Sequence, residues 1–316
     1  MEPIATREAY GRALAELGQK YEKIVVLDAD LSNSTRTALF AEKFPGRFFN
    51  MGIAEADMMG AAAGLAASGY TPFVSTFGVF ATGRVYDQIR NSIAYPRLNV
   101  KIAATHTGIT VGEDGASHQA LEDIALMRVL PNMTVLAPAD GRQAAEVVEA
   151  AASIDGPVYI RLGRLALPPV IPEDMPFELG KAQILREGDD VLIVATGMMT
   201  GLGLQAADML QKEGISAAVV NIHTIKPLDE ELLIRMAGRT RAVVTAEEHS
   251  IIGGFGGAVA ELLAENCPVP VVRVGVQDTF GESGAPQALL QKYGLTAENI
   301  VMAGKKAVKL KKPTNV

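Results

Sequence analysis

The chain has 316 residues, of which 48% are hydrophobic and 21% are charged, and its formal net charge is −7. This composition is typical of a folded protein of about two domains and excludes a disordered chain. The acidic balance argues against nucleic acid as a partner, because binding to phosphates needs a basic surface. The single cysteine, Cys267, excludes an internal disulfide and fits a reducing compartment.

Neither an export signal nor a membrane span is predicted. The N-terminus lacks a basic region followed by an apolar stretch. The longest run of small apolar residues, 58–67, is interrupted by Gly60 and Gly64 and is too short to cross a bilayer. We therefore expect a cytoplasmic protein without a membrane partner.

In chain order, short β-branched runs alternate with Ala- and Leu-rich amphipathic stretches, a pattern typical of βαβ units and parallel sheets. In the first half, the predicted strands are 24–27, 72–75, 100–104, 134–137 and 158–161. The predicted helices between them are 5–21, 55–67, 79–94, 121–129 and 141–153. The segment 165–176 carries four prolines and is predicted to be a linker or crossover.

A second alternation follows the linker. Its predicted strands are 191–195, 217–221, 242–246 and 271–274, and its predicted helices are 201–213, 229–237 and 256–265. The fold class predicted is α/β with two parallel-sheet domains, at 1–175 and 186–316. In such sheets, sites form beyond the carboxyl ends of the strands.

One glycine-rich stretch carries an unusual density of acid–base groups. The chain has four histidines, and two of them, His106 and His118, flank the sequence Gly-Glu-Asp-Gly that contains Asp114. Histidine titrates near neutrality, and glycine lets a backbone approach a small ligand closely. A single loop histidine is more often structural, but this cluster favours a site. No spacing here matches a zinc or calcium pattern, so we expect no metal ligands among these residues.

Two further segments place candidate ligands at helix starts. Glu55 lies in the first predicted turn of a helix, where the dipole favours a carboxylate, although an isolated glutamate there is often only a capping residue. Phe77 and Phe80 follow a predicted strand and lie three residues apart, on one side of a helix start. The two rings serve either as core or as a stacking platform for a planar heterocycle.

Candidate anion ligands are scattered along the chain. Arg7 lies just inside the first predicted helix, Ser32 follows the sequence Asp-Ala-Asp-Leu, and Arg161 and Arg164 follow a predicted strand. Arginine offers a planar fork for phosphate, so convergence of several on one cleft predicts a phosphorylated substrate.

Together these residues resemble the C-terminal portion of transketolase, that is, its pyrimidine-binding domain and its C-terminal domain. The likeness covers nearly the whole chain. It rests on several motifs in the family's order and near its spacing, namely Ala5-Thr6-Arg7, Asp30-Leu31-Ser32-Asn33, Gly52-Ile53-Ala54-Glu55, Ser75-Thr76-Phe77, Thr105-His106, the 112–119 stretch, and Leu130-Pro131-Asn132 leading to Pro138-Ala139-Asp140.

The resemblance implies a thiamine-diphosphate-dependent enzyme of the pentose phosphate pathway, which moves a two-carbon ketol unit from a ketose phosphate to an aldose phosphate. It implies that Glu55 hydrogen-bonds the aminopyrimidine ring nitrogen, which favours the imino tautomer that removes the thiazolium proton. Phe77 and Phe80 match the aromatic residues that pack on the pyrimidine, whereas the family's third aromatic aligns with Gly83.

The same resemblance implies substrate contacts. His106 and His118 would contact hydroxyls and the carbonyl or phosphate, and Asp114 would bind a donor hydroxyl. The sugar phosphate would be held by Arg7, Ser32 and Arg164, with Arg161 as a further member of this group.

One half of the family's machinery has no counterpart in the sequence. The Gly-Asp-Gly motif that, with a later Asn, binds diphosphate and the divalent cation does not occur in a matching context. The resemblance therefore implies a split transketolase, in which a separate N-terminal subunit supplies the diphosphate and Mg²⁺ site. We expect an α2β2 heterotetramer with the cofactor between the two kinds of chain.

Three alternatives remain. A 2-oxoacid dehydrogenase beta subunit has the same two-domain plan, but the paired histidines, Arg7 and Ser32 favour sugar phosphates. The segments 225–229 and 248–254 resemble a deoxyxylulose-phosphate synthase, although the sequence Thr-His-Thr-Gly around His106 matches transketolase better. The non-enzyme alternative is an inactive scaffold subunit that binds thiamine diphosphate.

Overall fold

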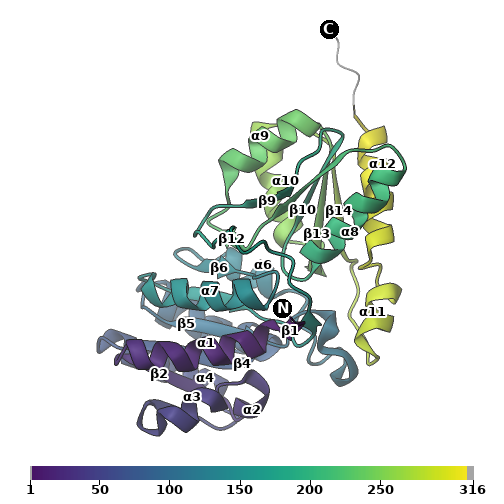
Figure 1. Ribbon diagram of the computed structural model, residues 1–316. Coiled ribbons are helices and arrows are strands. Elements are labelled where there is room, and N and C mark those ends of the chain that lie inside the picture. The colour runs from purple at the N-terminus through teal and green to yellow at the C-terminus, as the bar shows by residue number, and fades with distance from the viewer. Residues whose placement is uncertain (1, 312–316) are drawn as a thin grey trace.

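A seven-stranded sheet organises the first half of the chain. The computed structural model describes residues 2–311 (Figure 1). The strand order is β12-β6-β7-β5-β4-β2-β3, and every neighbouring pair is parallel except β12–β6. The strands are β2 (Ile24–Asp28), β3 (Phe48–Asn50), β4 (Thr71–Phe77), β5 (Lys101–Thr105), β6 (Thr134–Leu136), β7 (Val158–Arg161) and β12 (Thr224–Lys226).

Helices cover both faces of this sheet, because its apolar strands are buried on both sides. Helices α1 (Thr6–Lys20) and α7 (Gly141–Ser153) pack together over the face that carries Val26 and Phe73. Helix α4 (Glu55–Ala67) covers the face that carries Leu27 and Val74.

The second half forms a five-stranded sheet in the order β14-β13-β10-β11-β9, in which only the edge strand β9 is antiparallel to its neighbour. Helices α8 and α12 cover one face, and α9 and α10 cover the other. The strands are β9 (Gln183–Arg186), β10 (Val191–Ala195), β11 (Ala217–Asn221), β13 (Val243–Ser250) and β14 (Val271–Val276). The helices are α8 (Met199–Lys212), α9 (Glu230–Thr240), α10 (Phe255–Asn266), α11 (Pro286–Lys292) and α12 (Ala297–Lys309).

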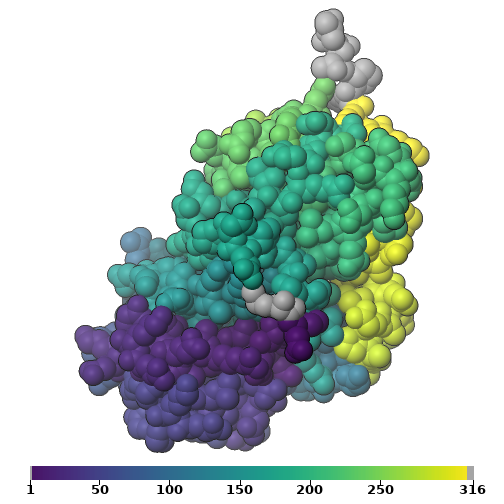
Figure 2. All heavy atoms as spheres, viewed as in Figure 1, coloured from purple at the N-terminus to yellow at the C-terminus, as the bar shows by residue number. Residues whose placement is uncertain are grey.

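The two halves share a strand. β12 follows β11 in the chain but pairs with β6 of the first sheet, with Thr224 opposite Leu136. Figure 2 shows the C-terminal segment, coloured yellow, reaching down beside the first half, where α11 packs on the 3-10 helix η3 (Ile109–Asp114). The two sheets therefore hold each other through main-chain pairing as well as through side chains.

Shorter elements fill the connections. A small antiparallel pair joins β1 (Ile4–Ala5) to β8 (Ala166–Leu167). The remaining elements are α2 (Ser32–Thr35), α3 (Ala38–Lys43), α5 (Gly78–Thr82), α6 (Asp123–Arg128), the 3-10 helix η1 (Pro45–Arg47) and the π-helix η2 (Gln88–Ala94).

The α/β architecture with two mainly parallel sheets confirms the predicted fold class. The prediction of a single helix over 79–94 is wrong. Helix α5 ends at Thr82, and the chain makes a turn from Gly83 before it enters η2. The predicted strand 242–246 is longer, since β13 runs on to Ser250 and buries Glu247, Glu248 and His249. The division at 175 and 186 stays a prediction. No helix among residues 2–311 is long and apolar enough to span a bilayer.

Candidate active site

The carboxyl ends of β4 and β5 carry the aromatic part of the site. β4 ends at Phe77 and α5 begins at the next residue, so Phe80 stands one turn later. Their ring centroids lie 6.1 Å apart with an interplanar angle of 13°. The His106 ring stacks on Phe77 at 3.8 Å, and the His118 ring meets Phe80 edge-on at 5.3 Å. The structure thus brings together four predicted site residues that are spread over 42 positions of the sequence.

His106 is held in one tautomer by its neighbours. It follows β5 with a φ of +55°, a strained value for a residue with a side chain. Arg7 Nη1 donates to Nε2 at 2.9 Å, so the proton of the neutral ring lies on Nδ1, 2.9 Å from Thr105 Oγ1. Burial lowers the pKa of His106 to about 3, and the charges of Arg7 and Arg164 act in the same direction. His106 is therefore a neutral group at physiological pH.

Glu55 is the first residue of α4, as the sequence predicts, and its side chain is 5% exposed. Arg84, which lies between α5 and η2, donates from Nη1 to Glu55 Oε1 at 2.7 Å. The guanidinium carbon of Arg84 also lies 4.2 Å from the Phe80 ring centroid. The carboxylate is thereby connected to the aromatic cluster through one arginine that the sequence analysis did not single out.

Further basic groups lie near the Arg7–His106 contact. Arg7 Nη1 also donates at 2.9 Å to the carbonyl of Ser34, which lies within α2. Burial lowers the pKa of Arg7, and the charges of Arg36 and Arg164 lower it further. Three guanidinium groups thus lie within electrostatic reach of one another, an arrangement that favours a bound anion.

Arg164 connects this basic region to the glycine-rich stretch. Its Nη1 donates to the Val111 carbonyl at 2.7 Å and lies 3.6 Å from Asp114 Oδ2 and 3.8 Å from Glu113 Oε2. These are half-exposed pairs that exchange readily with solvent and ligands. Asp114 and Arg164 therefore face each other and place a carboxylate and a cation side by side.

The second half of the chain supports the glycine-rich stretch. Gln119 Nε2 donates to the Glu282 carbonyl at 2.9 Å. At Gly115, where φ is +76°, a Cβ would lie 2.5 Å from Ser283 Oγ, so a larger residue would not fit. The segment before α11 thus fixes the backbone that presents Asp114 and His118.

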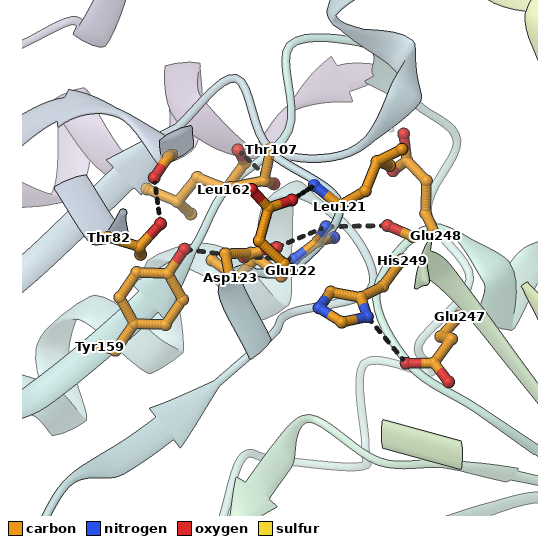
Figure 3. A network of polar contacts seen from close by, with 12 residues as sticks. Thr82, Thr107, Leu121, Glu122, Asp123, Tyr159, Leu162, Glu247, Glu248 and His249 are labelled. Carbon is orange, nitrogen blue, oxygen red and sulfur yellow. Dashed lines mark hydrogen bonds and ion pairs between the residues drawn. The ribbon is translucent and has the colours of Figure 1, made fainter. Parts of the chain in front are cut away.

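Arg161, the remaining predicted anion ligand, contacts a different set of groups from Arg7 and Arg164. Its Nε and Nη2 donate to the two oxygens of Asp123 at 2.8 and 3.2 Å, and Nη2 also donates to the Glu248 carbonyl at 2.8 Å. Tyr159 donates to the same Asp123 carboxylate at 2.7 Å (Figure 3). The side chain of Arg161 is 7% exposed and that of Asp123 is fully buried. These contacts are those of a group that joins the two halves of the chain.

Glu247, Glu248 and His249 complete this network from β13 (Figure 3). Glu248 Oε1 accepts from the Thr110 amide at 2.8 Å, and Glu247 accepts from the amides that begin α10. Burial raises the pKa of Glu247 to about 7. The sequence marked this stretch only through its resemblance to a known family. Its buried positions were not predicted, because the predicted strand ended at Ala246 whereas β13 runs on to Ser250.

Glu55 and the rings of Phe77 and Phe80 fit the heterocyclic end of a cofactor, whereas no cluster of side chains among residues 2–311 fits its metal-binding end. A buried carboxylate beside stacked aromatic rings is the donor set for an aminopyrimidine. Among residues 2–311, no group of three or more His, Cys, Asp or Glu side chains is arranged to hold a metal ion. The metal-binding end of such a cofactor therefore has no ligand cluster in the part of the chain that the structure describes.

Two family models match the chain in succession. The transketolase pyrimidine-binding domain matches residues 2–169, and the transketolase C-terminal domain matches residues 180–300. The chain is also similar to a solved structure described as an inactive β4 tetramer of a split-gene transketolase, with 62% identity, a TM-score of 0.92, and coverage of 98% of this chain and 100% of that one.

Curated relatives agree with these models. A protein of Methanocaldococcus jannaschii, provisionally named transketolase C-terminal section, is 52% identical over 93% of either chain. The 6-deoxy-6-sulfo-D-fructose transketolase subunit of Clostridium sp. strain MSTE9 is 49% identical over 94% of this chain and 92% of its own. The 1-deoxy-D-xylulose-5-phosphate synthase of Desulforudis audaxviator is 38% identical over 94% of this chain and 47% of its own. The chain belongs to the transketolase family, as a C-terminal section made of a pyrimidine-binding and a C-terminal domain.

Proposed function

We propose that this chain is the C-terminal subunit of a two-chain, thiamine-diphosphate-dependent transketolase, which transfers a two-carbon ketol unit from a ketose phosphate to an aldose phosphate. The observation that carries the proposal is the convergence of Phe77, Phe80, His106 and His118 beside Arg7, with ring centroids 3.8 to 6.3 Å apart. An inactive scaffold subunit would have no chemical need for a neutral histidine held by an arginine.

Each residue has a role that its surroundings support. Glu55, at the start of α4, would hydrogen-bond the aminopyrimidine ring nitrogen, and Phe77 and Phe80 would pack on the ring. When bound, thiamine diphosphate supplies the carbanion chemistry of ketol transfer. The Nε2 atom of His106 accepts a hydrogen bond from Arg7. If Arg7 instead donated to a bound phosphate, Nε2 would be free to accept from a substrate hydroxyl.

The remaining polar groups suit an anionic sugar. Arg7, Ser32 and Arg164 would hold the phosphate, Asp114 a donor hydroxyl, and His118 the carbonyl or a hydroxyl. The sulfosugar enzyme among the relatives acts on a substrate with a different anionic group. Guanidinium groups bind both phosphate and sulfonate, so the preferred sugar has to be determined by measuring activity with a panel of substrates.

A separate N-terminal subunit would complete the site. Because the described residues offer no metal-binding cluster, we propose that the diphosphate and Mg²⁺ are bound mainly by a partner chain that carries the Gly-Asp-Gly motif. The cofactor would then lie between the two chains of an α2β2 heterotetramer. The inactivity of the related β4 assembly agrees with a subunit that needs its partner.

The test is a calorimetric titration of thiamine diphosphate with Mg²⁺ into this chain alone and into its mixture with the partner. We expect binding and ketol transfer only in the mixture. Glu55→Gln should abolish transfer there, whereas Glu149→Gln, which changes an exposed glutamate on α7, should leave it unchanged. Robust turnover by the isolated chain would contradict the two-subunit proposal.

A second candidate is a deoxyxylulose-phosphate synthase-type subunit. It is favoured by the 38% identical relative and by the β13 stretch that contains Glu248 and His249. The two candidates use different donors. Turnover with pyruvate and not with a ketose phosphate would select this second function.

A further inference from the structure

The ion pair between Glu55 and Arg84 occupies the groups on which cofactor binding is proposed to depend. In the part of the chain that the structure describes, the partner of the Glu55 carboxylate is Arg84, at 2.7 Å. Glu55 is 5% exposed and Arg84 is 48% exposed. A buried carboxylate is therefore covered by a cation that can itself reach solvent.

Arg84 also lies against the aromatic ring next to this carboxylate. Its guanidinium carbon is 4.2 Å from the Phe80 centroid, within the range of a cation–π contact. A guanidinium is a flat group with N–H donors at its rim. Its two contacts are a carboxylate at the edge and an aromatic ring at the face, and an aminopyrimidine ring in this site would need the same two.

We propose, on the basis of the function proposed above, that Arg84 competes with the pyrimidine ring of the cofactor for Glu55 and Phe80. Two flat groups do not fit on the same carboxylate edge and ring face. The hydrogen-bond roles differ as well. The Glu55 carboxylate accepts from Arg84, whereas a ring nitrogen without a hydrogen needs Glu55 to take up a proton from solvent and then donate a hydrogen bond. The ion pair therefore opens before the cofactor bond forms, and Arg84 is a positioning residue that sets cofactor affinity.

The surroundings of Arg84 allow this movement. The residue before it, Gly83, has no side chain that could pack against Arg84, and a Cβ there would make only an ordinary contact, 3.5 Å from the Val79 carbonyl oxygen. The Arg84 side chain is 48% exposed, so its guanidinium can turn to solvent without becoming a buried, unpaired cation. Arg161 shows the contrast, since its side chain is 7% exposed and is held by Asp123 on two nitrogens.

The experiment measures binding rather than turnover. Thiamine diphosphate with Mg²⁺ is titrated calorimetrically into the complex of this chain with its Gly-Asp-Gly-bearing partner, for wild type, Arg84→Ala and Arg90→Ala. Arg90 is a matched control, because it is an exposed arginine in the next element, and its partner is Asn91. We expect Arg84→Ala to tighten binding by roughly three- to tenfold and Arg90→Ala to leave it unchanged.

Two results would overturn the inference, and they are distinguishable. If wild type binds and Arg84→Ala binds equally or more weakly, Arg84 is a wall of the site and not a competitor, while the proposed function stands. If neither binds, the proposed function fails and the competition fails with it. Far-ultraviolet circular dichroism of each variant verifies that the fold is intact.

Discussion

Replacement of Arg161 by methionine should destabilise the protein far more than replacement of any exposed arginine. The substitution keeps the volume of the side-chain stem and removes three hydrogen bonds, two to Asp123 and one to the Glu248 carbonyl. Asp123 would remain fully buried with the Tyr159 hydroxyl as its donor. Breaking a buried ion pair from one side costs about 3–5 kcal/mol, because the other charge is left uncompensated.

The assay is urea-induced unfolding followed by far-ultraviolet circular dichroism, with the free energy of unfolding compared between variants. Arg239→Met is the matched control, since its pairs with Glu187 and Asp189 are exposed, and we expect it to cost less than about 1 kcal/mol. The double variant Arg161→Met/Asp123→Leu should recover much of the loss, because the Asp123 charge is removed together with its partner. Equal losses for Arg161→Met and Arg239→Met would refute the reasoning.

Two further predictions concern buried positions. Burial lowers the pKa of Lys101 to about 7 from 10.5, so between these values the unfolded lysine holds a proton that the folded one lacks, and stability rises with pH. Urea unfolding at pH 7 and pH 9 should show wild type gaining about 2–3 kcal/mol relative to Lys101→Met, and a constant difference would contradict this. Gly108→Ala would place a Cβ 2.3 Å from the Glu248 carboxyl, whereas Gly69→Ala meets nothing within 4 Å at a similar φ. Thermal melts should therefore show Gly108→Ala costing at least about 2 kcal/mol more than Gly69→Ala, and equal costs would argue against the clash.

The sequence was most informative about strands that are buried on both faces. Runs such as 158–161 and 191–195 coincide with β7 and β10, because β-branched residues without polar alternation have few other places in a fold. It was least informative about pairings distant in the chain. β12 is three residues long, and its partner β6 lies 88 positions before it, counting from Leu136 to Thr224.

In the candidate site, too, the sequence predicted which residues take part but not which residues they contact. The family resemblance implies that His106 and Phe77 belong to one site, and their rings lie 3.8 Å apart. Pair partners were not predictable, because they depend on where side chains meet in three dimensions. Arg161 and Arg164 are three residues apart, yet one is enclosed with Asp123 and the other faces Asp114. Arg84 falls inside the helix predicted over 79–94, where a single arginine has no sequence signature.

The β12–β6 ladder also limits where this protein can be divided. A cut in the proline-rich segment 165–176 would place β6 and β12 on different molecules, and β6 would become an open edge available to foreign strands. Re-forming the ladder would then carry the entropic cost of association, which the single chain avoids. Residues 2–311 are thus expected to be inherited and expressed as one piece, even in a family that includes split-gene members.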